Sequence, residues 1–274
     1  MTDRELEALV SLLDDEDIRP DIESRILSLG KEAIPFLEKQ WEQSFEPEVQ
    51  NYIEDIIHRL QLDLLHHRML QWKESGSDDL IKGMWLIATY QYPDLDLVKL
   101  KQDLEQLYYE VWLEHKSDAN PFDKVKFMNS VLYGKLKFKA NTKNFHSPAN
   151  SMINQVLESK RGNPVSLGVV YLVIAQKLGM PVYGVNLPNM FILTYKDENQ
   201  QFYINAFNRG LIFSREDIDS YIAQINLVQR PIFYEPCSHT DIVIRVLRNL
   251  SISFEKLDEH HKSDEIKQLL KLIE

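Results

Sequence analysis

The chain has 274 residues, and its 44% hydrophobic and 10% aromatic content is ordinary for a globular protein with a sizeable core. The formal net charge is −11, and residues 1–60 carry 16 acidic against six basic side chains. Such a region repels a phosphate backbone, which argues against nucleic acid as the main ligand. We interpret it as a solvated helical face, with an acidic docking surface for a basic partner as the alternative.

The single cysteine, Cys237, excludes an internal disulfide and a cysteine-based zinc cage, and it fits a reducing compartment. The N-terminus lacks the basic start and apolar run of a signal peptide, and no stretch approaches 18 apolar residues. None of the nine glycines forms a phosphate-binding loop. We therefore expect a cytoplasmic protein with no membrane segment and no cofactor.

The first part of the chain has the 3.6-residue apolar period of helices. The pattern predicts helices over residues 4–13, 21–29, 31–43 and 47–73. Gly30 is a plausible cap of the second helix, and Trp41 is expected on the inward face of the third. The segment LGKEAIPFL lies at a junction of short helices that resembles a HEAT-like repeat unit. We predict a HEAT-like helical region over residues 1–75, ended by the break ESGSD.

The sequence pattern of the rest of the chain predicts an α+β fold. We expect a helical lead-in over residues 76–148, ahead of a domain core over residues 149–235. A C-terminal helical hairpin is expected over residues 236–274. The expected helices of the lead-in are 79–90, 95–114 and 121–133, followed by an irregular loop over 138–149. The core has a helix that opens at Asn163-Pro164, three antiparallel strands and a further helix opening at Ser214. The strands are expected at 182–187, 190–195 and 201–206, and the final helices at 241–257 and 262–273.

Residues 150–207 carry four landmarks in a fixed order: NSMINQVLESKRGNP, VSLGVVYLVIAQKLGMP, GVNLPNMFIL and YINAFNRG. They resemble the core of the SirB-type transglutaminase-like proteins, bacterial proteins in which tetratricopeptide-type helices follow this core. The phrases TYQYPDLDL and FMNSVLYGKLKF also resemble the region ahead of the core, so that the resemblance covers about residues 80–230. It implies a papain-like sheet, and it makes the hairpin at 236–274 a tetratricopeptide-like element.

The resemblance also implies a catalytic arrangement of a cysteine at the helix start, a histidine on the next strand and an aspartate or asparagine on the one after. In this chain Ser166 stands at the cysteine position, Met190 at the histidine position and Asn205 at the aspartate position. Methionine cannot move a proton, and a serine without a base is a poor nucleophile. We expect a catalytically degenerate member.

The function we predict is a non-catalytic protein-interaction or regulatory module whose former active-site cleft binds a peptide segment. The residues expected to line that cleft are Asn163, Ser166, Asn189, Met190 and Asn205. One alternative is an acyl-transfer hydrolase or amidase that uses Ser166 with a distant histidine, His146. Another is a structural scaffold whose cleft is filled by Met190 and Phe191.

The remaining histidines and the cysteine predict no chemistry. His58, His66 and His67 fall on a helix without a carboxylate at metal-ligand spacing, and His260-His261 lie in a turn, so no metal site is expected. Cys237 and His239 are near neighbours that the backbone points apart, which favours a loop cysteine over a nucleophile.

Overall fold

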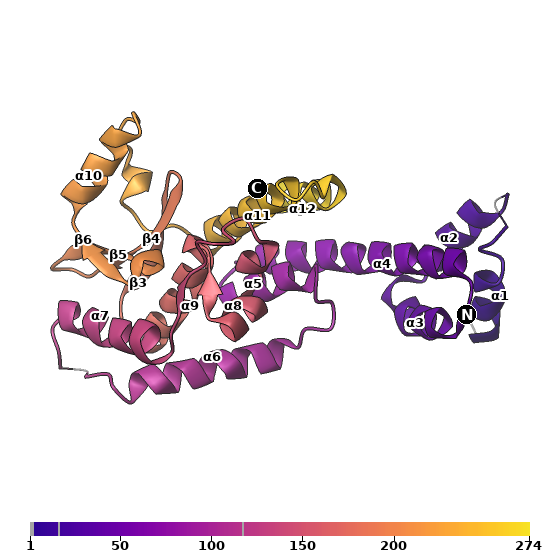
Figure 1. The fold of residues 1–274 in the computed structure, drawn as a ribbon, viewed down its shortest axis with the longest axis horizontal. Helices are drawn as coiled ribbons and strands as arrows, with labels where there is room; N and C mark the ends of the chain where they lie inside the picture. Colours follow the sequence, from indigo (N-terminus) through magenta and orange to yellow (C-terminus); the bar gives the residue numbers. More distant parts are fainter. Residues whose placement is uncertain (1–2, 16, 117) are drawn as a thin grey trace. The chain divides into compact units, whose positions relative to one another are not determined.

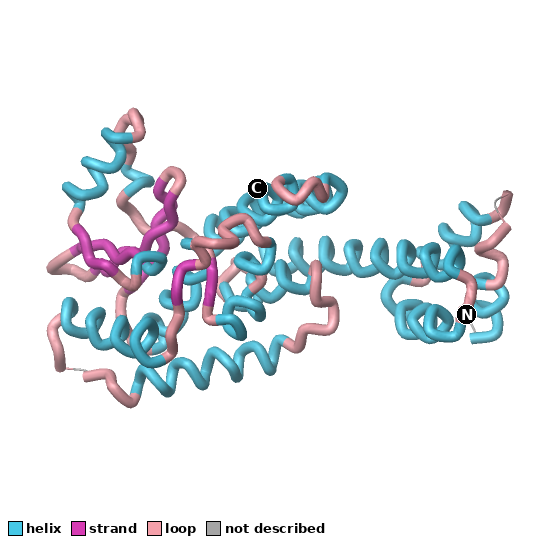
Figure 2. Tube along the Cα trace, viewed as in Figure 1, coloured by secondary structure: helices cyan, strands magenta, loops and turns pink. Residues whose placement is uncertain are grey.

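A computed structural model describes residues 3–15, 17–116 and 118–274 (Figures 1 and 2). The chain divides into two compact units, Met1–Gln71 and Trp72–Glu274. The predicted α+β fold class is confirmed, since helices precede and follow a small antiparallel sheet along the chain. Within the described residues, none of the helices has both the length and the apolar content needed to cross a membrane.

The first unit is helical throughout. Its elements are α1 (Asp3–Val10), α2 (Arg19–Leu27), a 3-10 turn η1 (Gly30–Ala33), α3 (Ile34–Gln43) and α4 (Pro47–Glu74) up to Gln71. Gly30 has a φ of +68°, a conformation that glycine adopts without strain, and it joins the end of α2 to η1. Pro35 lies in the first turn of α3, where its missing amide hydrogen has no helical acceptor to lose.

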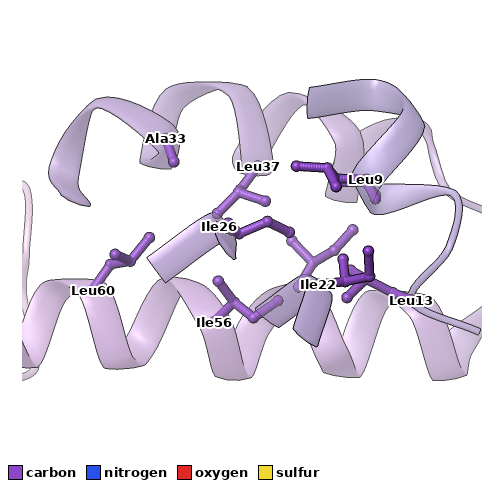
Figure 3. Close-up of a cluster of buried hydrophobic side chains, with 10 residues drawn as sticks. Leu9, Leu13, Ile22, Ile26, Ala33, Leu37, Ile56 and Leu60 are labelled. Atoms are coloured by element: carbon purple, nitrogen blue, oxygen red, sulfur yellow. The ribbon is translucent and has the colours of Figure 1, made fainter. Parts of the chain in front are cut away.

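One apolar cluster holds this unit together (Figure 3). Its buried members come from every helix of the unit: Leu9, Val10, Leu13, Ile22, Ile26, Ala33, Leu37, Ile53, Ile56 and Leu60. Trp41 does not join them, contrary to the predicted pattern. It is 37% exposed, and its indole N–H donates to Glu54 Oε1 at 2.8 Å, because the polar end of the ring finds its partner at the surface. The HEAT-like character of residues 1–75 stays a prediction.

The second unit places further helices around the sheet. They are α5 (Leu80–Thr89), α6 (Leu97–Trp112), α7 (Pro121–Asn129) with a π-helical continuation η2 (Ser130–Lys135), η3 (Pro148–Ser151), α8 (Ile153–Ser159), α9 (Pro164–Lys177), α10 (Arg215–Gln224), η5 (Pro231–Phe233), α11 (His239–Glu255) and α12 (His260–Ile273). Asp79, Asp96 and Asn120 cap α5, α6 and α7, each accepting a backbone N–H of the first turn.

The sheet is an antiparallel meander of four strands in chain order (Figure 1). The strands are β3 (Val182–Leu187), β4 (Met190–Lys196), β5 (Gln201–Asn205) and β6 (Leu211–Phe213), with the 3-10 turn η4 (Ala206–Asn208) before the last. The turn Pro188-Asn189 joins β3 to β4, and Asn189 takes a φ of +57° there, which asparagine tolerates.

Short strands are what the sequence pattern missed. β6 has only three residues. β1 (Lys139–Ala140) lies within the segment predicted as an irregular loop, and it pairs in parallel with β2 (Arg161–Gly162), which lies between α8 and α9. The prediction of an irregular loop was therefore wrong at residues 139–140. Strands of two or three residues are too short to show an alternating pattern.

Helix α9 is the centre of the second unit. It packs against α6, α11, β3 and β4, and ten of its residues are buried. The positions predicted to face inward are Val165, Val169, Leu172 and Val173. The first three are buried and Val173 is only partly buried, whereas Leu167 and Tyr171 on other sides of the helix are buried as well. A helix that is apolar all round is one surrounded by protein, so a single inward face was too narrow a prediction.

The two faces of the sheet pack against different helices. A Cβ added at Gly168 of α9 would lie 2.7 Å from the Phe191 ring, and one at Gly184 of β3 would lie equally close to it. Phe191 therefore fits between two glycines on the α9 face. Ile192, the next residue, points to the other face, where it joins Tyr203 and the α10 residue Ile218.

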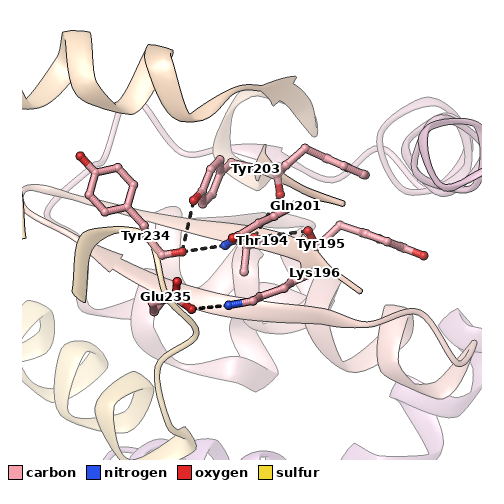
Figure 4. A network of polar contacts seen from close by, with 8 residues as sticks. Thr194, Tyr195, Lys196, Gln201, Tyr203, Tyr234 and Glu235 are labelled. Atoms are coloured by element: carbon pink, nitrogen blue, oxygen red, sulfur yellow. Dashed lines mark hydrogen bonds and ion pairs between the residues drawn. The ribbon is translucent and has the colours of Figure 1, made fainter. Parts of the chain in front are cut away.

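Polar contacts fix the chain between α10 and α11 against the strands (Figure 4). The backbone carbonyl of Tyr234 accepts from Gln201 Nε2 at 2.9 Å and from the Tyr203 hydroxyl at 3.3 Å, and Lys196 forms an ion pair with Glu235. Helix α11 then begins with a capping box between Ser238 and Asp241. Helices α11 and α12 pack as a pair in the predicted place, and their tetratricopeptide-like character stays a prediction.

We expect Gly168→Ala to destabilise the protein, because Phe191 has no room to move away from the new methyl group. Overpacking of this kind costs about 1–3 kcal/mol. We expect the loss to exceed the roughly 1 kcal/mol that alanine gains over glycine in a helix. Gly134→Ala is the control, since nothing lies within 4 Å of its added Cβ. Urea unfolding of both variants tests this, and equal stability of the two would contradict the packing described for Phe191.

Candidate functional site

The start of α9 is held by a reciprocal pair of hydrogen bonds. Asn163 is the N-cap residue, and its Oδ1 accepts the backbone N–H of Ser166 at 2.9 Å. In return Ser166 Oγ accepts the backbone N–H of Asn163 at 3.0 Å, which completes a capping box. Asn163 Nδ2 also donates to Ser151 Oγ at 3.3 Å, which fastens the cap to η3.

The Ser166 hydroxyl is thus committed to the backbone. It is 0% exposed, and besides accepting from Asn163 N it donates to the Asn163 carbonyl at 3.3 Å. A Cβ added at Gly162 would lie 2.5 Å from Ser166 Oγ, so that β2 covers it closely. Among the described residues, no histidine forms a hydrogen bond with this hydroxyl. The residue at the expected nucleophile position acts here as a helix cap.

The other two positions of the expected triad contact each other. Asn205 Nδ2 donates to Met190 Sδ at 3.8 Å, and Asn205 Oδ1 accepts the backbone N–H of Asn208 at 3.0 Å. Met190 packs at the edge of the cluster around Ile192 on the α10 side of the sheet. No hydrogen bond between described residues links Met190 or Asn205 to Ser166. The structure brings together two of the three positions.

A cavity of about 370 Å³ opens beside the cap of α9. Its walls come from the loop before η3, the α9 cap, the β3–β4 turn with the first part of β4, and one side of α11. The lining residues are Phe145, His146, Asn163, Pro164, Asn189, Phe191, Arg245, Arg248, Asn249, Ile252 and Ser253. Of the five predicted cleft residues, Asn163 and Asn189 line it, whereas Ser166, Met190 and Asn205 do not.

The α11 wall supplies most of the polar groups, and the sequence analysis did not find it. Arg245 is half-buried, and burial together with the charge of Arg248 lowers the pKa of its guanidinium. Arg248 pairs with Glu274 at 2.7 Å near the surface. Arg245, Arg248, Asn249 and Ile252 are spaced three or four residues apart, so that they share one side of α11 next to its buried apolar stripe. A search of the predicted final helices for a second, polar stripe could have found them.

A larger cavity, of about 640 Å³, lies between α6 and α8. Its walls carry charges of both signs, among them Asp103, Glu110 and Lys160, and none of the predicted site residues belongs to it. Lys135 already pairs with Glu110 at 2.8 Å there. None of the positions implied by the resemblance lines this cavity, so that the smaller cavity beside the α9 cap is the better candidate site.

The surroundings of Cys237 do not activate its thiol. Burial, and then the charge of Asp241, raise the pKa of the Cys237 thiol to about 12, which keeps it protonated near neutral pH. His239 Nδ1 lies 3.1 Å from the carbonyl oxygen of Ser77. Within the part of the chain that the structure describes, no three histidine, cysteine or acidic side chains are grouped as metal ligands.

Two bacterial proteins are similar to a large part of this chain. A "UPF0162 protein" of Xylella fastidiosa (strain Temecula1 / ATCC 700964) is 30% identical over 194 residues, which are 65% of this chain and 66% of that protein. The "UPF0162 protein YchA" of Escherichia coli (strain K12) is 28% identical over 179 residues, 65% of each chain. The match therefore spans slightly less than two thirds of these relatives.

A human protein shares a shorter segment. "F-box only protein 21" of Homo sapiens is 35% identical over 105 residues, which are 35% of this chain and 17% of that protein. No solved structure matches the chain significantly. The family model described as transglutaminase-like superfamily matches residues 98–248, more than half of the chain, from the start of α6 to the middle of α11. The cavity residues Asn249, Ile252 and Ser253 lie just beyond the end of that match. The chain belongs to the transglutaminase-like superfamily.

Proposed function

We propose that the chain is a non-catalytic, SirB-type transglutaminase-like protein that binds an extended peptide segment in the cavity beside the α9 cap and serves as a protein-interaction or regulatory module. One observation carries the proposal. The Ser166 hydroxyl is closed onto the Asn163 backbone, while the cavity next to it is open, and three of its polar side chains, Asn189, Arg245 and Asn249, form no hydrogen bond with another described residue.

The absence of a suitable base supports a binding role. The thioether of Met190 accepts a weak hydrogen bond from Asn205 and cannot take or give a proton. His146 lines the cavity but forms its ring contact with Phe145, at a centroid distance of 5.2 Å. The protonated Cys237 thiol is likewise a weak nucleophile. These contacts leave the position of the expected nucleophile without a partner for acyl transfer.

The chemistry of the walls favours a peptide. Phe145, Phe191 and Ile252 provide apolar surface, and the side-chain amides of Asn189 and Asn249 offer donors and acceptors that suit a peptide backbone. A volume of about 370 Å³ is near the lower end of ligand pockets, which is enough for one side chain and its adjoining backbone. The remainder of the segment would lie along the surface.

A second part of the proposal concerns residues 1–60, where we place an acidic docking surface for a basic partner protein in the cytoplasm. Acidic side chains such as Asp14, Asp15 and Glu32 are exposed there. Exposed charges of one sign raise the rate at which an oppositely charged partner associates, and this effect weakens as salt is added.

A substitution that fills the cavity should strongly weaken peptide binding. Ile252→Trp places a larger side chain on the cavity wall, where Ile252 is 46% exposed. Leu257→Trp is the matched control, since Leu257 is 51% exposed just beyond α11 and does not line the cavity. The measurement is retention of a randomised, amidated hexapeptide library by the immobilised full-length chain, read by mass spectrometry. We expect at least about tenfold less retention with Ile252→Trp, and unchanged retention with Leu257→Trp.

Two results would count against the binding proposal. One is that the wild-type chain retains no hexapeptide above the level of the support alone. The other is that both tryptophan variants retain peptides equally well, because the peptides would then bind elsewhere on the surface.

Ser166→Ala tests whether this serine is a cap or a nucleophile. The substitution leaves the Asn163 N–H buried without its acceptor, which costs about 1–3 kcal/mol. Ser130→Ala is the control, because that hydroxyl is exposed and only donates to the Phe127 carbonyl at 2.7 Å. Urea unfolding should show the loss for Ser166→Ala alone. A fluorophosphonate probe should leave Ser166 unlabelled, and labelling that depends on His146 would instead support the hydrolase alternative.

A further inference from the structure

The cavity beside the α9 cap has an unbalanced positive charge. Arg245 and Arg248 stand three residues apart on α11, so that their side chains leave the same side of the helix. Among the described residues that line the cavity, none carries a carboxylate. Within the part of the chain that the structure describes, the one acidic group that pairs with a lining residue is Glu274, which holds Arg248 at the outer edge.

Arg245 lacks the partner that a half-buried guanidinium usually has. Within residues 3–15, 17–116 and 118–274, neither a hydrogen bond nor an ion pair ends on it. Its neighbour Tyr221 directs its hydroxyl to the Pro188 carbonyl at 2.9 Å and so leaves the cation uncompensated. Removing a charge from water without a counter-charge is unfavourable, and an anion that enters the cavity removes that penalty.

Two amide side chains lie near enough to act with the arginine. Asn189 is exposed on the β3–β4 turn and Asn249 follows Arg245 by one helical turn. Neither side chain forms a hydrogen bond with another described residue. An amide donates and accepts at once, as a peptide group requires, whereas guanidinium groups only donate. The cavity thus combines a cation with groups suited to a peptide backbone.

We infer that the cavity recognises a carboxylate group of the bound peptide, which Arg245 holds through its paired N–H groups while Asn189 and Asn249 hold the adjoining backbone. This inference rests on the proposed function and specifies the chemistry of its ligand. Arg248 lies on the same wall, and it can release its exposed ion pair with Glu274 and bind the carboxylate of the peptide instead. Exposed pairs of that kind are worth little, so that the exchange costs little.

The supply of donors favours a carboxylate over a phosphate. A phosphate carries nearly two charges and three strong acceptor oxygens, and proteins commonly bind it with several free backbone amides of a helix start. Here the amides of Asn163 and Ser166 are already used by the capping box, and Pro164 has none. One unpaired guanidinium presents two parallel N–H groups, which match the two oxygens of one carboxylate.

Four hexapeptide libraries test the inference on the full-length chain. All are N-acetylated, with residue three fixed and the other five randomised. Three are amidated at the C-terminus and carry glutamate, glutamine or lysine at the fixed position. The fourth carries glutamine there and a free C-terminal carboxylate. Retention by the immobilised protein is measured by mass spectrometry at low and at physiological salt.

We expect the wild-type chain to retain the glutamate library or the free-carboxylate library about tenfold more than the amidated glutamine library, and the lysine library least. The library that gains identifies the source of the carboxylate, a side chain or a chain terminus. Arg245→Met should remove the preference, because it keeps the aliphatic stem and deletes the charge. Arg230→Met is the matched control, since Arg230 is exposed and does not line the cavity.

The libraries distinguish a failure of the proposed peptide-binding function from a failure of the carboxylate inference. If none of the libraries is retained, the proposed peptide-binding function is wrong and the inference falls with it. If all four are retained equally and Arg245→Met changes nothing, the binding function stands but the carboxylate inference is overturned. Thermal unfolding of Arg245→Met within a few degrees of wild type confirms that a lost preference reflects the missing charge and not a lost fold.

Discussion

The capping box between Asn163 and Ser166 is the interaction on which the candidate site depends. It fixes where α9 begins, and α9 in turn is the helix against which β3, β4, α6 and α11 pack. One of the two hydrogen bonds of the capping box engages Ser166 Oγ, the hydroxyl at the expected nucleophile position. A hydroxyl that accepts one buried N–H and donates to one buried carbonyl has its hydrogen-bonding capacity largely filled, so that the contacts of Ser166 stabilise the helix start.

The alternation of side chains along β4 explains why the three expected triad positions do not meet. Phe191 is fixed between Gly168 and Gly184 on the α9 face, so that its neighbours on the strand face the other way. Met190 accordingly packs toward the α10 side and contacts Asn205 there. The buried phenylalanine therefore decides two things at once: it forms part of the wall beside the α9 cap, and it directs Met190 away from Ser166.

Strong local signals predicted most of the fold. The apolar periods of α1 to α4, the Asn-Pro start and Gly-Met-Pro end of α9, and the hairpin strands β3 to β5 all have signals contained within a few residues. What escaped prediction depends on contacts between distant segments. The parallel pair β1 and β2 joins residues more than twenty positions apart and has two residues on each side. Trp41 carries a helical apolar signal, yet Glu54 on the next helix draws its indole N–H to the surface.

Only part of the candidate site was predicted, because local sequence signals mark some of its residues and contacts between distant segments place the others. Asn163 and Asn189 lie at a helix start and in a tight turn, which sequence patterns mark well, and both line the cavity. Arg245 and Asn249 lie in the middle of a helix whose apolar stripe dominates its pattern, and only the packing of α11 against η3, α9 and β3 turns their side of the helix into a wall. Charge on such a wall is not required for folding, since an apolar or neutral residue would avoid the penalty of a half-buried cation. Arg245 stands there without a hydrogen bond or ion pair to another described residue, and the carboxylate that we propose as its ligand would supply the missing counter-charge.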